Sequence, residues 1–258
     1  MKKIYTVRNP AQQQTHLWDN HAIHEEVDAC SRRKIADIFL RHLPQAEPIL
    51  EAGCGLGAWV IYLSKLGYNI NGIDNNQVVI RQLKAWDPAL QVSSGDIRRL
   101  PCPDSSLGAY ISLGVLEHFE EGCEAAMREA YRVLKPGGLI FFTVPLNNFF
   151  RKTVAHPLRT LYLFWRRRRG EDVFFAEFRY SRRETESLLR KHGFEPVFST
   201  WDDFNVPTMS LGLWADFPQL HSKKLYRLKL AGKIAALLLN TLSPWLAAAG
   251  VFCLARKK

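Results

Sequence analysis

The fold of this chain is decided by residues 49–74, ILEAGCGLGAWVIYLSKLGYNINGID. The stretch opens with a short, mostly apolar run and then places glycine at positions 53, 55 and 57. A helical pattern follows and ends at Gly67, and glycine is the residue favoured just after the end of a helix. A second apolar run ends at Asp74. The stretch therefore predicts a strand, a glycine turn, a helix and a second strand parallel to the first.

The glycine turn and Asp74 together predict a site for a nucleoside. Glycines at alternate positions let the backbone turn sharply and let a ligand approach without meeting a Cβ. The helix that follows directs its amide groups and its positive dipole end into the turn. A carboxylate at the end of the next strand lies beside this turn and can accept from two ribose hydroxyls. Taken alone, Gly53-x-Gly55-x-x-Ala58 would equally suit a nicotinamide dinucleotide.

Strand and helix patterns alternate as far as residue 145, which predicts parallel strands joined by right-handed crossovers. A capping box at Ser181 and Glu184 marks the start of a later helix. The other expected helices cover 24–43, 76–87, 121–138 and part of 223–246, and the other expected strands cover 90–97, 107–119, 139–145, 195–204 and 249–258.

Composition limits the class of protein. The 258 residues are 47% hydrophobic and carry a net charge of +10, which favours an anionic partner such as a nucleic acid, a lipid surface or a charged metabolite. The five cysteines form no C-x-x-C pair, which argues against a disulfide framework or zinc site and for a reducing compartment. His21 and His24 lack further ligands at metal-binding spacing, so no metal is expected. The N-terminus has no apolar secretory run, and we expect a cytoplasmic protein.

Four stretches in succession resemble the motifs of class I S-adenosylmethionine-dependent methyltransferases. They are residues 49–76, SSGDIRRLPCPDSSL (93–107), AYISLGVLEHF (109–119) and EAYRVLKPGGLIFFTVP (129–145). The set is most similar to the type 11 group, which includes ubiquinone/menaquinone methyltransferase-like proteins. The resemblance implies a Rossmann-like, doubly wound α/β sheet of seven strands, mostly parallel with an antiparallel last strand, plus an α-helical insertion. It also implies S-adenosyl-L-methionine as the cofactor and S-adenosyl-L-homocysteine as its product.

The same resemblance implies which residues bind the cofactor. Asp74 would bind the ribose hydroxyls, Asp96 would accept from the adenine amino group, and Glu51 would lie near the methionine amino group. The other implied cofactor-binding residues are Gly53, Gly55, Gly57, Asn75, Ile97, Leu113 and Gly114.

His118 is the candidate catalytic residue. It follows the fourth strand and could orient or deprotonate a methyl acceptor. The alternative is that His118 caps a loop or contacts only the cofactor. Trp18 and His21 are candidates for a lid over the cofactor, since N-terminal segments have that role in similar proteins.

The acceptor side is basic and rich in aromatic residues. Residues 146–192 hold 12 basic and five acidic residues. Arginines interleaved with aromatics suit an interfacial helix on an anionic membrane, a nucleic-acid surface, or a packed insertion with a basic edge. The uncharged stretch 234–255 is long enough to span a bilayer. Polar residues and Pro244 interrupt it, so we expect a helix over the acceptor pocket or on a membrane surface, followed by the last strand.

These observations predict a single methyltransferase domain over 1–258. It would comprise an N-terminal helical lid (1–48), a cofactor-binding core (49–145) and an acceptor-side part (146–258). The expected activity is methyl transfer to a small, hydrophobic or lipid-like acceptor. Two alternatives stay open: an RNA (tRNA) methyltransferase and a non-catalytic cofactor-binding protein. A nicotinamide-linked oxidoreductase fits the motifs after Gly95 and around His118 less well.

Overall fold

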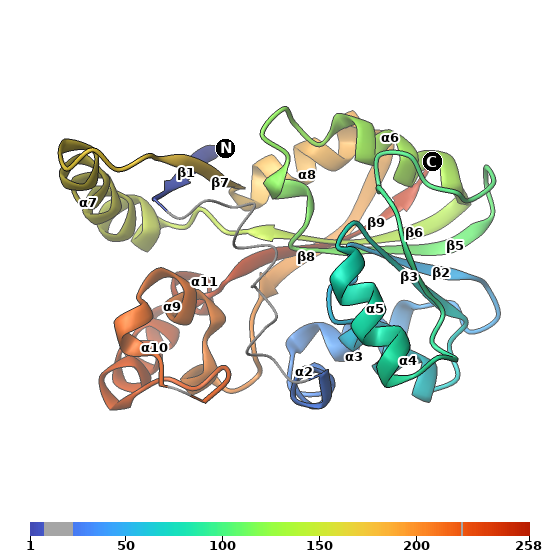
Figure 1. Cartoon of the computed structure of the whole chain (residues 1–258), viewed down its shortest axis with the longest axis horizontal. Coiled ribbons are helices and arrows are strands. Elements are labelled where there is room, and N and C mark those ends of the chain that lie inside the picture. Colours follow the sequence, from blue (N-terminus) through green and yellow to red (C-terminus); the bar gives the residue numbers. More distant parts are fainter. Residues whose placement is uncertain (8–22, 223) are drawn as a thin grey trace.

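The computed structural model describes residues 1–7, 23–222 and 224–258. Its centre is a seven-stranded sheet with the order β4-β3-β2-β5-β6-β9-β8 (Figure 1). The strands are β2 (Ile49–Ala52), β3 (Ile70–Asp74), β4 (Val92–Ser94), β5 (Leu107–Leu113), β6 (Leu134–Pro145), β8 (Phe194–Asp202) and β9 (Gly250–Lys257). The five strands β4, β3, β2, β5 and β6 pair in parallel with their neighbours in the sheet. Strand β9 runs antiparallel to both β6 and β8. This confirms the Rossmann-like sheet with an antiparallel last strand.

Helices cover both faces of the sheet (Figure 1). They are α2 (Ile23–Cys30), α3 (Lys34–His42), α4 (Ala58–Lys65), α5 (Gln77–Trp86), α6 (Glu124–Val133) and α8 (Arg182–Lys191). Phe141 of β6 packs into the core with α3, α4 and α5, while its neighbour Phe142 packs into the core with α6 and α8. Alternate side chains of a strand point to opposite faces, so a strand covered on both sides is apolar throughout.

The helix expected over 24–43 is two helices, and this prediction was wrong in that respect. The chain is extended at Arg33, between α2 and α3. There the Arg33 guanidinium binds the Asp202 carboxylate at 2.7 and 2.9 Å, and the Lys34 amide donates to the Asp203 carbonyl oxygen. Contacts with the end of β8, far along the sequence, therefore interrupt a helical pattern that is locally continuous.

Two other elements are shorter than expected. The helix over 121–138 ends at Val133, because Leu134 already pairs with Leu107 of β5. The next matched pair is Ala109 with Leu139, so the Lys-Pro-Gly-Gly segment loops out of β6 as a long bulge. The strand over 107–119 ends at Leu113, and Leu116–His118 forms a 3₁₀ turn, η1.

The acceptor-side part leaves the sheet where β6 ends and returns to it at β8 and β9. Its elements are η2 (Arg151–Ala155), α7 (His156–Arg168), β7 (Phe174–Arg179), η3 (Pro207–Met209), α9 (Leu211–Asp216), η4 (Pro218–Leu220), α10 (Leu230–Leu242) and α11 (Pro244–Ala247). It is largely helical, as expected, but β7 was not predicted. This strand pairs antiparallel with β1 (Lys2–Thr6), at the start of the expected helical lid. Trp18 and His21 lie outside the described residues.

The uncharged stretch 234–255 is divided among α10, α11 and β9. Among the described residues, no helix combines the length and the apolar character needed to cross a bilayer.

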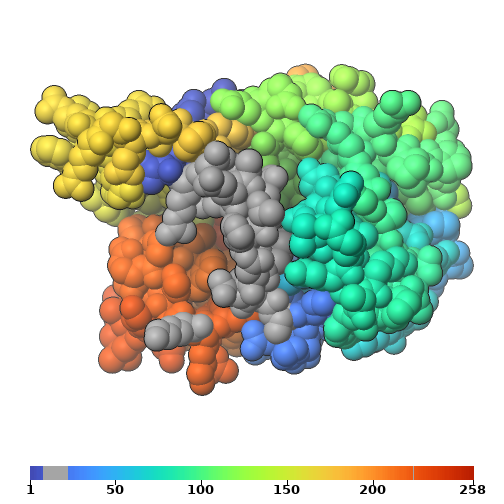
Figure 2. All heavy atoms as spheres, in the orientation of Figure 1, coloured from blue at the N-terminus to red at the C-terminus, as the bar shows by residue number. Residues whose placement is uncertain are grey.

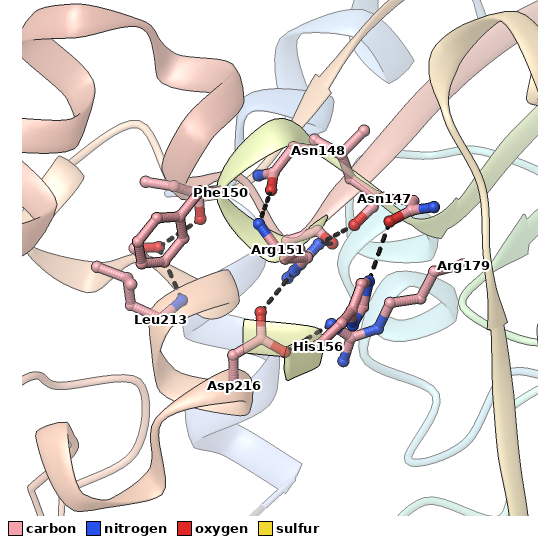
Figure 3. A network of polar contacts seen from close by, with 12 residues as sticks. Asn147, Asn148, Phe150, Arg151, His156, Arg179, Leu213 and Asp216 are labelled. Carbon is pink, nitrogen blue, oxygen red and sulfur yellow. Dashed lines mark hydrogen bonds and ion pairs between the residues drawn. The ribbon is translucent and has the colours of Figure 1, made fainter. Parts of the chain in front are cut away.

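A buried ionic network holds the acceptor-side part against the sheet (Figure 3). The Asp216 carboxylate of α9 lies 2.5 Å from Nε of Arg151 and 2.7 Å from a terminal nitrogen of Arg179. Arg151 also donates to the backbone carbonyl oxygens of Leu146 and Ala249, at the ends of β6 and β9. All three charged side chains are almost fully buried. Asp216 therefore joins α9, β7 and the edge of the sheet.

We expect Asp216→Asn to destabilise the protein by about 3–5 kcal/mol, because it leaves the buried Arg151 guanidinium without its counter-charge and leaves Arg179 with Glu177 alone. Burial raises the pKa of Asp216, but Arg151 and Arg179 lower it more, so the folded-state pKa lies below the unfolded one. The stabilisation is present above the unfolded pKa, near 4, and is lost as the pH falls through the folded pKa. Urea unfolding at several pH values measures both effects.

The control is Asp104→Asn, which breaks an exposed ion pair with Arg132. We expect it to change stability by less than about 1 kcal/mol. Equal losses in the two variants would contradict the role given to the buried network.

Candidate cofactor site

The turn between β2 and α4 accepts only glycine at key positions. Gly53, Gly55 and Gly57 all have positive φ, at 83°, 49° and 63°. A Cβ at position 53 would lie 2.4 Å from a methyl carbon of Val115, so the β5 loop is packed directly against the turn. The left-handed backbone and this close approach both favour glycine. At positions 53, 55 and 57 the turn therefore presents bare peptide groups at the carboxyl end of β2.

Asp74 joins the end of β3 to the glycine turn. One of its carboxylate oxygens accepts from the Gly55 amide at 2.9 Å, and the other accepts from the Asn76 amide at 2.8 Å. Each carboxylate oxygen keeps acceptor capacity for a further donor, such as a ribose hydroxyl. Asn75 is exposed next to it, and Asn76 caps α5. The structure thus brings Asp74 and the turn together as the sequence predicts.

Glu51 is a buried carboxyl group with unused acceptor capacity. Its residue is 4% exposed, and Oε2 has no hydrogen-bond partner among the described residues. Burial raises the pKa of Glu51 to about 8, opposed by a hydrogen bond from the Val60 backbone amide. An ammonium group would satisfy the orphaned oxygen and favour its ionised form. The methionine amino group of S-adenosylmethionine is such a group, so these residues fit the implied cofactor.

Asp96 follows β4 and is already paired. Both carboxylate oxygens accept from the Arg98 guanidinium, at 2.8 to 3.0 Å, and Arg98 also binds Glu121 at 2.8 Å. The side-chain bond to Arg98 lowers the pKa of Asp96. An adenine amino group would share this carboxylate with Arg98, and the adenine role stays a prediction. Ile97 is buried in the core with Leu50.

The loop after β5 forms the opposite side of the site. Leu113 pairs with Thr143 of β6, and the chain turns at Gly114, where φ is 71°. Glu117 lies close to this turn, with one carboxylate oxygen 3.5 Å from the position of a Cβ on Gly114. Leu113 and Gly114 therefore lie at the carboxyl edge of the sheet, in the strand next to β2. That edge is where ligands bind in open α/β sheets.

His118 is held by a strand from the acceptor side. Its Nδ1 lies 2.8 Å from the Ala176 carbonyl oxygen of β7. A carbonyl only accepts, so Nδ1 carries the proton and the neutral ring keeps its lone pair on Nε2. Surrounding atoms lower the pKa of His118, but Glu117 and the Ala176 carbonyl raise it more. The lone pair on Nε2 would then be available to accept a proton.

Two residues around His118, Glu117 and Ala176, were given little or no role in the sequence analysis. Glu117 is buried, Oε2 has no hydrogen-bond partner among the described residues, and burial raises its pKa to about 7. The Ala176 carbonyl oxygen contacts His118 because β7 packs against η1. The acidic residue next to a histidine was visible in the sequence, but no local pattern marks an alanine carbonyl as its partner.

Comparison with known proteins finds relatives of the core. Residues 50–142 match a family described as a methyltransferase domain. The chain is 28% identical over 132 residues to a probable S-adenosylmethionine-dependent methyltransferase of Mycolicibacterium smegmatis, which covers 50% of this chain and 51% of that protein. The chain thus spans about half the length of this curated relative.

Two further similarities extend beyond the core. The chain is 29% identical over 187 residues to a malonyl-[acyl-carrier protein] O-methyltransferase of Pseudescherichia vulneris, over 70% of each chain. A crystal structure of a protein from Methanosarcina mazei, described as a S-adenosylmethionine-dependent methyltransferase, superposes with a TM-score of 0.58. It is 19% identical and covers 85% of this chain and 96% of its own. This second likeness concerns the fold alone.

We expect Asp74→Ala to abolish measurable binding of S-adenosylhomocysteine, because the ribose loses its acceptor and the turn loses its tie to β3. Asp74→Asn should weaken binding by about a hundredfold, since a hydrogen bond to a charged group contributes about 1.5–3 kcal/mol. Isothermal titration measures both. Asp87→Ala, which removes a carboxylate at the far end of α5, is the matched control. Tight binding retained by Asp74→Ala would count against the site.

A second prediction concerns pH. If Glu51 must be ionised to hold the ammonium group, cofactor affinity rises by about tenfold per pH unit below its pKa near 8. Glu51→Gln cannot ionise, and its affinity should stay flat between pH 6 and 7.5. Titrations in buffers of different ionisation enthalpy should also show proton release on binding to the wild type only. An unchanged pH profile in the variant would contradict this role.

Proposed function

We propose that residues 50–142 form a class I S-adenosylmethionine-dependent methyltransferase domain of the type 11 group, and that this chain transfers the methyl group of S-adenosylmethionine to a small, hydrophobic or lipid-like acceptor. The product would be S-adenosylhomocysteine and a methylated acceptor. Three observations carry the proposal: the contact of Asp74 with the glycine turn, the buried Glu51 carboxyl group, and a histidine that follows the neighbouring strand β5 and is held from the acceptor side.

The residues of the chain have separable roles in this reaction. Asp74 and the glycine turn hold the nucleoside, and Glu51 holds the amino group, which fixes the position of the donor. Bound S-adenosylmethionine supplies a methyl group on a sulfonium with a good leaving group. Positioning can then provide much of the acceleration, since an oriented pair of reactants has already lost its translational freedom.

His118 is proposed as the proton acceptor where the acceptor group must lose a proton. With Nδ1 donating to Ala176, Nε2 can accept a proton from a hydroxyl, acid or amine. The Glu117 carboxylate raises the pKa of His118 and stabilises the cation that forms. A base in this place is expected to contribute about 10²–10⁴ in rate.

The acceptor class rests on two supports. The malonyl-[acyl-carrier protein] O-methyltransferase of P. vulneris, similar over 70% of this chain, is named for an acyl-group acceptor. The acceptor side also exposes several large apolar side chains on α7 and α10. A cytoplasmic location stays a prediction from the sequence.

The experiment that tests the proposal uses the full chain with a radiolabelled methyl donor. A cell extract is separated after incubation into organic-soluble lipid, RNA and water-soluble metabolite fractions. We expect label in the organic-soluble fraction. Label in RNA alone would replace the proposal by the RNA methyltransferase alternative. Binding of the donor without label in any fraction would favour a non-catalytic cofactor-binding protein.

His118→Gln then tests the base. We expect turnover to fall by about a hundredfold or more, with donor affinity unchanged within about twofold. His42→Gln, at an exposed histidine at the end of α3, is the matched control. An equal rate in both variants would show that the acceptor needs no base from this position.

A further inference from the structure

Helix α7 exposes an apolar stripe. Leu158, Leu161, Tyr162 and Trp165 follow the spacing i, i+3, i+4, i+7 and therefore share one face. All four are exposed, and Trp165 is 55% exposed. Of this helix only His156 is buried. Helix α7 thus stands away from the core with its aromatic and aliphatic side chains in contact with solvent.

Helix α10 exposes a second stripe. Leu230, Ile234, Leu237 and Leu238 follow the spacing i, i+4, i+7, i+8, and Leu238 is 62% exposed. The buried face of the same helix is formed by Gly232 and Ala236. A helix on the surface of a monomer normally carries polar residues on its outer face. Helix α10 carries aliphatic ones, which marks an interaction surface.

Positive charge accompanies both stripes. Segment 149–170 contains seven basic residues and no acidic one, and segment 224–249 contains four basic residues and no acidic one. The Arg168 guanidinium lies 4.5 Å from the centre of the Phe164 ring, and that of Arg166 lies 5.5 Å from the centre of the Tyr162 ring. Lys229 and Lys233 are exposed beside the α10 stripe. Apolar and cationic groups therefore alternate over both surfaces.

The two helices lie at the same end of the molecule. The chain passes from the carboxyl end of β6 through η2 into α7, and from α10 through α11 into β9. Both lie at one end of the long axis of the molecule (Figure 1), and the space-filling view shows their surfaces at that end (Figure 2). This end carries the acceptor-side part and lies beyond the carboxyl edge of the parallel strands.

The charge and the side-chain chemistry of α7 and α10 indicate which kind of partner binds them. A nucleic acid would match the arginines and aromatics of α7 but would gain nothing from the aliphatic stripe of α10. A second copy in a two-fold interface would bring like-charged surfaces together. An anionic bilayer matches both, because basic residues contact lipid phosphates while apolar side chains enter the boundary between headgroups and acyl chains.

We propose that α7 and α10 form an interfacial docking surface for an anionic lipid bilayer. Residues Leu158, Leu161, Tyr162, Trp165, Leu230, Ile234, Leu237 and Leu238 enter the interface. The exposed basic residues of the two segments surround them, namely Lys152, Arg167, Arg168, Arg169, Lys224, Arg227, Lys229 and Lys233. The acceptor side thereby faces the membrane, while the cofactor enters from the aqueous side. Docking itself is independent of methyl transfer, so the two proposals fail separately.

Co-sedimentation of the full chain with vesicles tests docking. We expect binding to vesicles of phosphatidylcholine with phosphatidylglycerol, much weaker binding to phosphatidylcholine alone, and a decrease with added salt. Leu238→Glu and Trp165→Ala should each lower the partition coefficient by about tenfold, since each removes one large apolar side chain from the interface. Arg167→Gln with Arg168→Gln should lower it by about fivefold for each charge removed.

The controls are Leu66→Glu and Trp86→Ala, at exposed positions on the cofactor-binding core, and they should bind vesicles like the wild type. All variants should bind S-adenosylhomocysteine normally, which separates docking from the cofactor site. Equal binding to neutral and anionic vesicles, or equal losses in the control variants, would overturn the proposal. So would a wild-type dimer that Leu238→Glu dissociates without lipid, because a second copy would then cover the α10 stripe.

Discussion

The hydrogen bond between the Asp74 carboxylate and the Gly55 amide is the contact on which the site depends. It joins the ends of two neighbouring parallel strands across the start of α4. The glycine turn can follow its left-handed path only because positions 53, 55 and 57 have no side chain. The packing of Val115 against Gly53 then brings the β5 loop to the same place. A single backbone geometry therefore positions Asp74, which we propose binds the donor, and the loop that carries His118.

A buried ionic network ties the acceptor-side part to this core, in addition to the apolar packing of α8, β8 and β9. The Arg151–Asp216–Arg179 network joins η2, α9 and β7 beneath the helices, with all its charges buried. Buried ion pairs contribute little net stability but require one geometry, since any unpaired member is costly. The network thus suits a part of the molecule that must hold β7, and with it the Ala176 carbonyl, at a defined distance from His118.

The separation of the two parts explains the distribution of surface chemistry. The core buries its apolar residues on both faces of the sheet, as a cofactor-binding platform requires. The helices of the acceptor-side part instead leave aliphatic and aromatic residues in solvent, surrounded by cations. A hydrophobic acceptor and an anionic bilayer would be met by this same surface. Methyl transfer and membrane docking would then use the same end of the molecule without a conformational switch.

The sequence by itself determined the sheet, the glycine turn and the place of Asp74, whereas Glu51 was implied only by the resemblance to a family. The sheet, the turn and Asp74 depend on local periodicity, on glycine at fixed spacing and on strand–turn–helix order, which are all short-range properties. Tertiary structure alone decided the break at Arg33, the pairing of β7 with β1, the Arg98 partner of Asp96 and the orientation of His118. Each of these, except the Asp96–Arg98 pair, joins residues far apart in the chain. That pair is close in sequence. Whether Arg98 shares the Asp96 carboxylate with an adenine amino group nevertheless depends on how the loop after β4 folds. Local pattern carries no information about such contacts, because the energy that selects them arises only when distant segments meet.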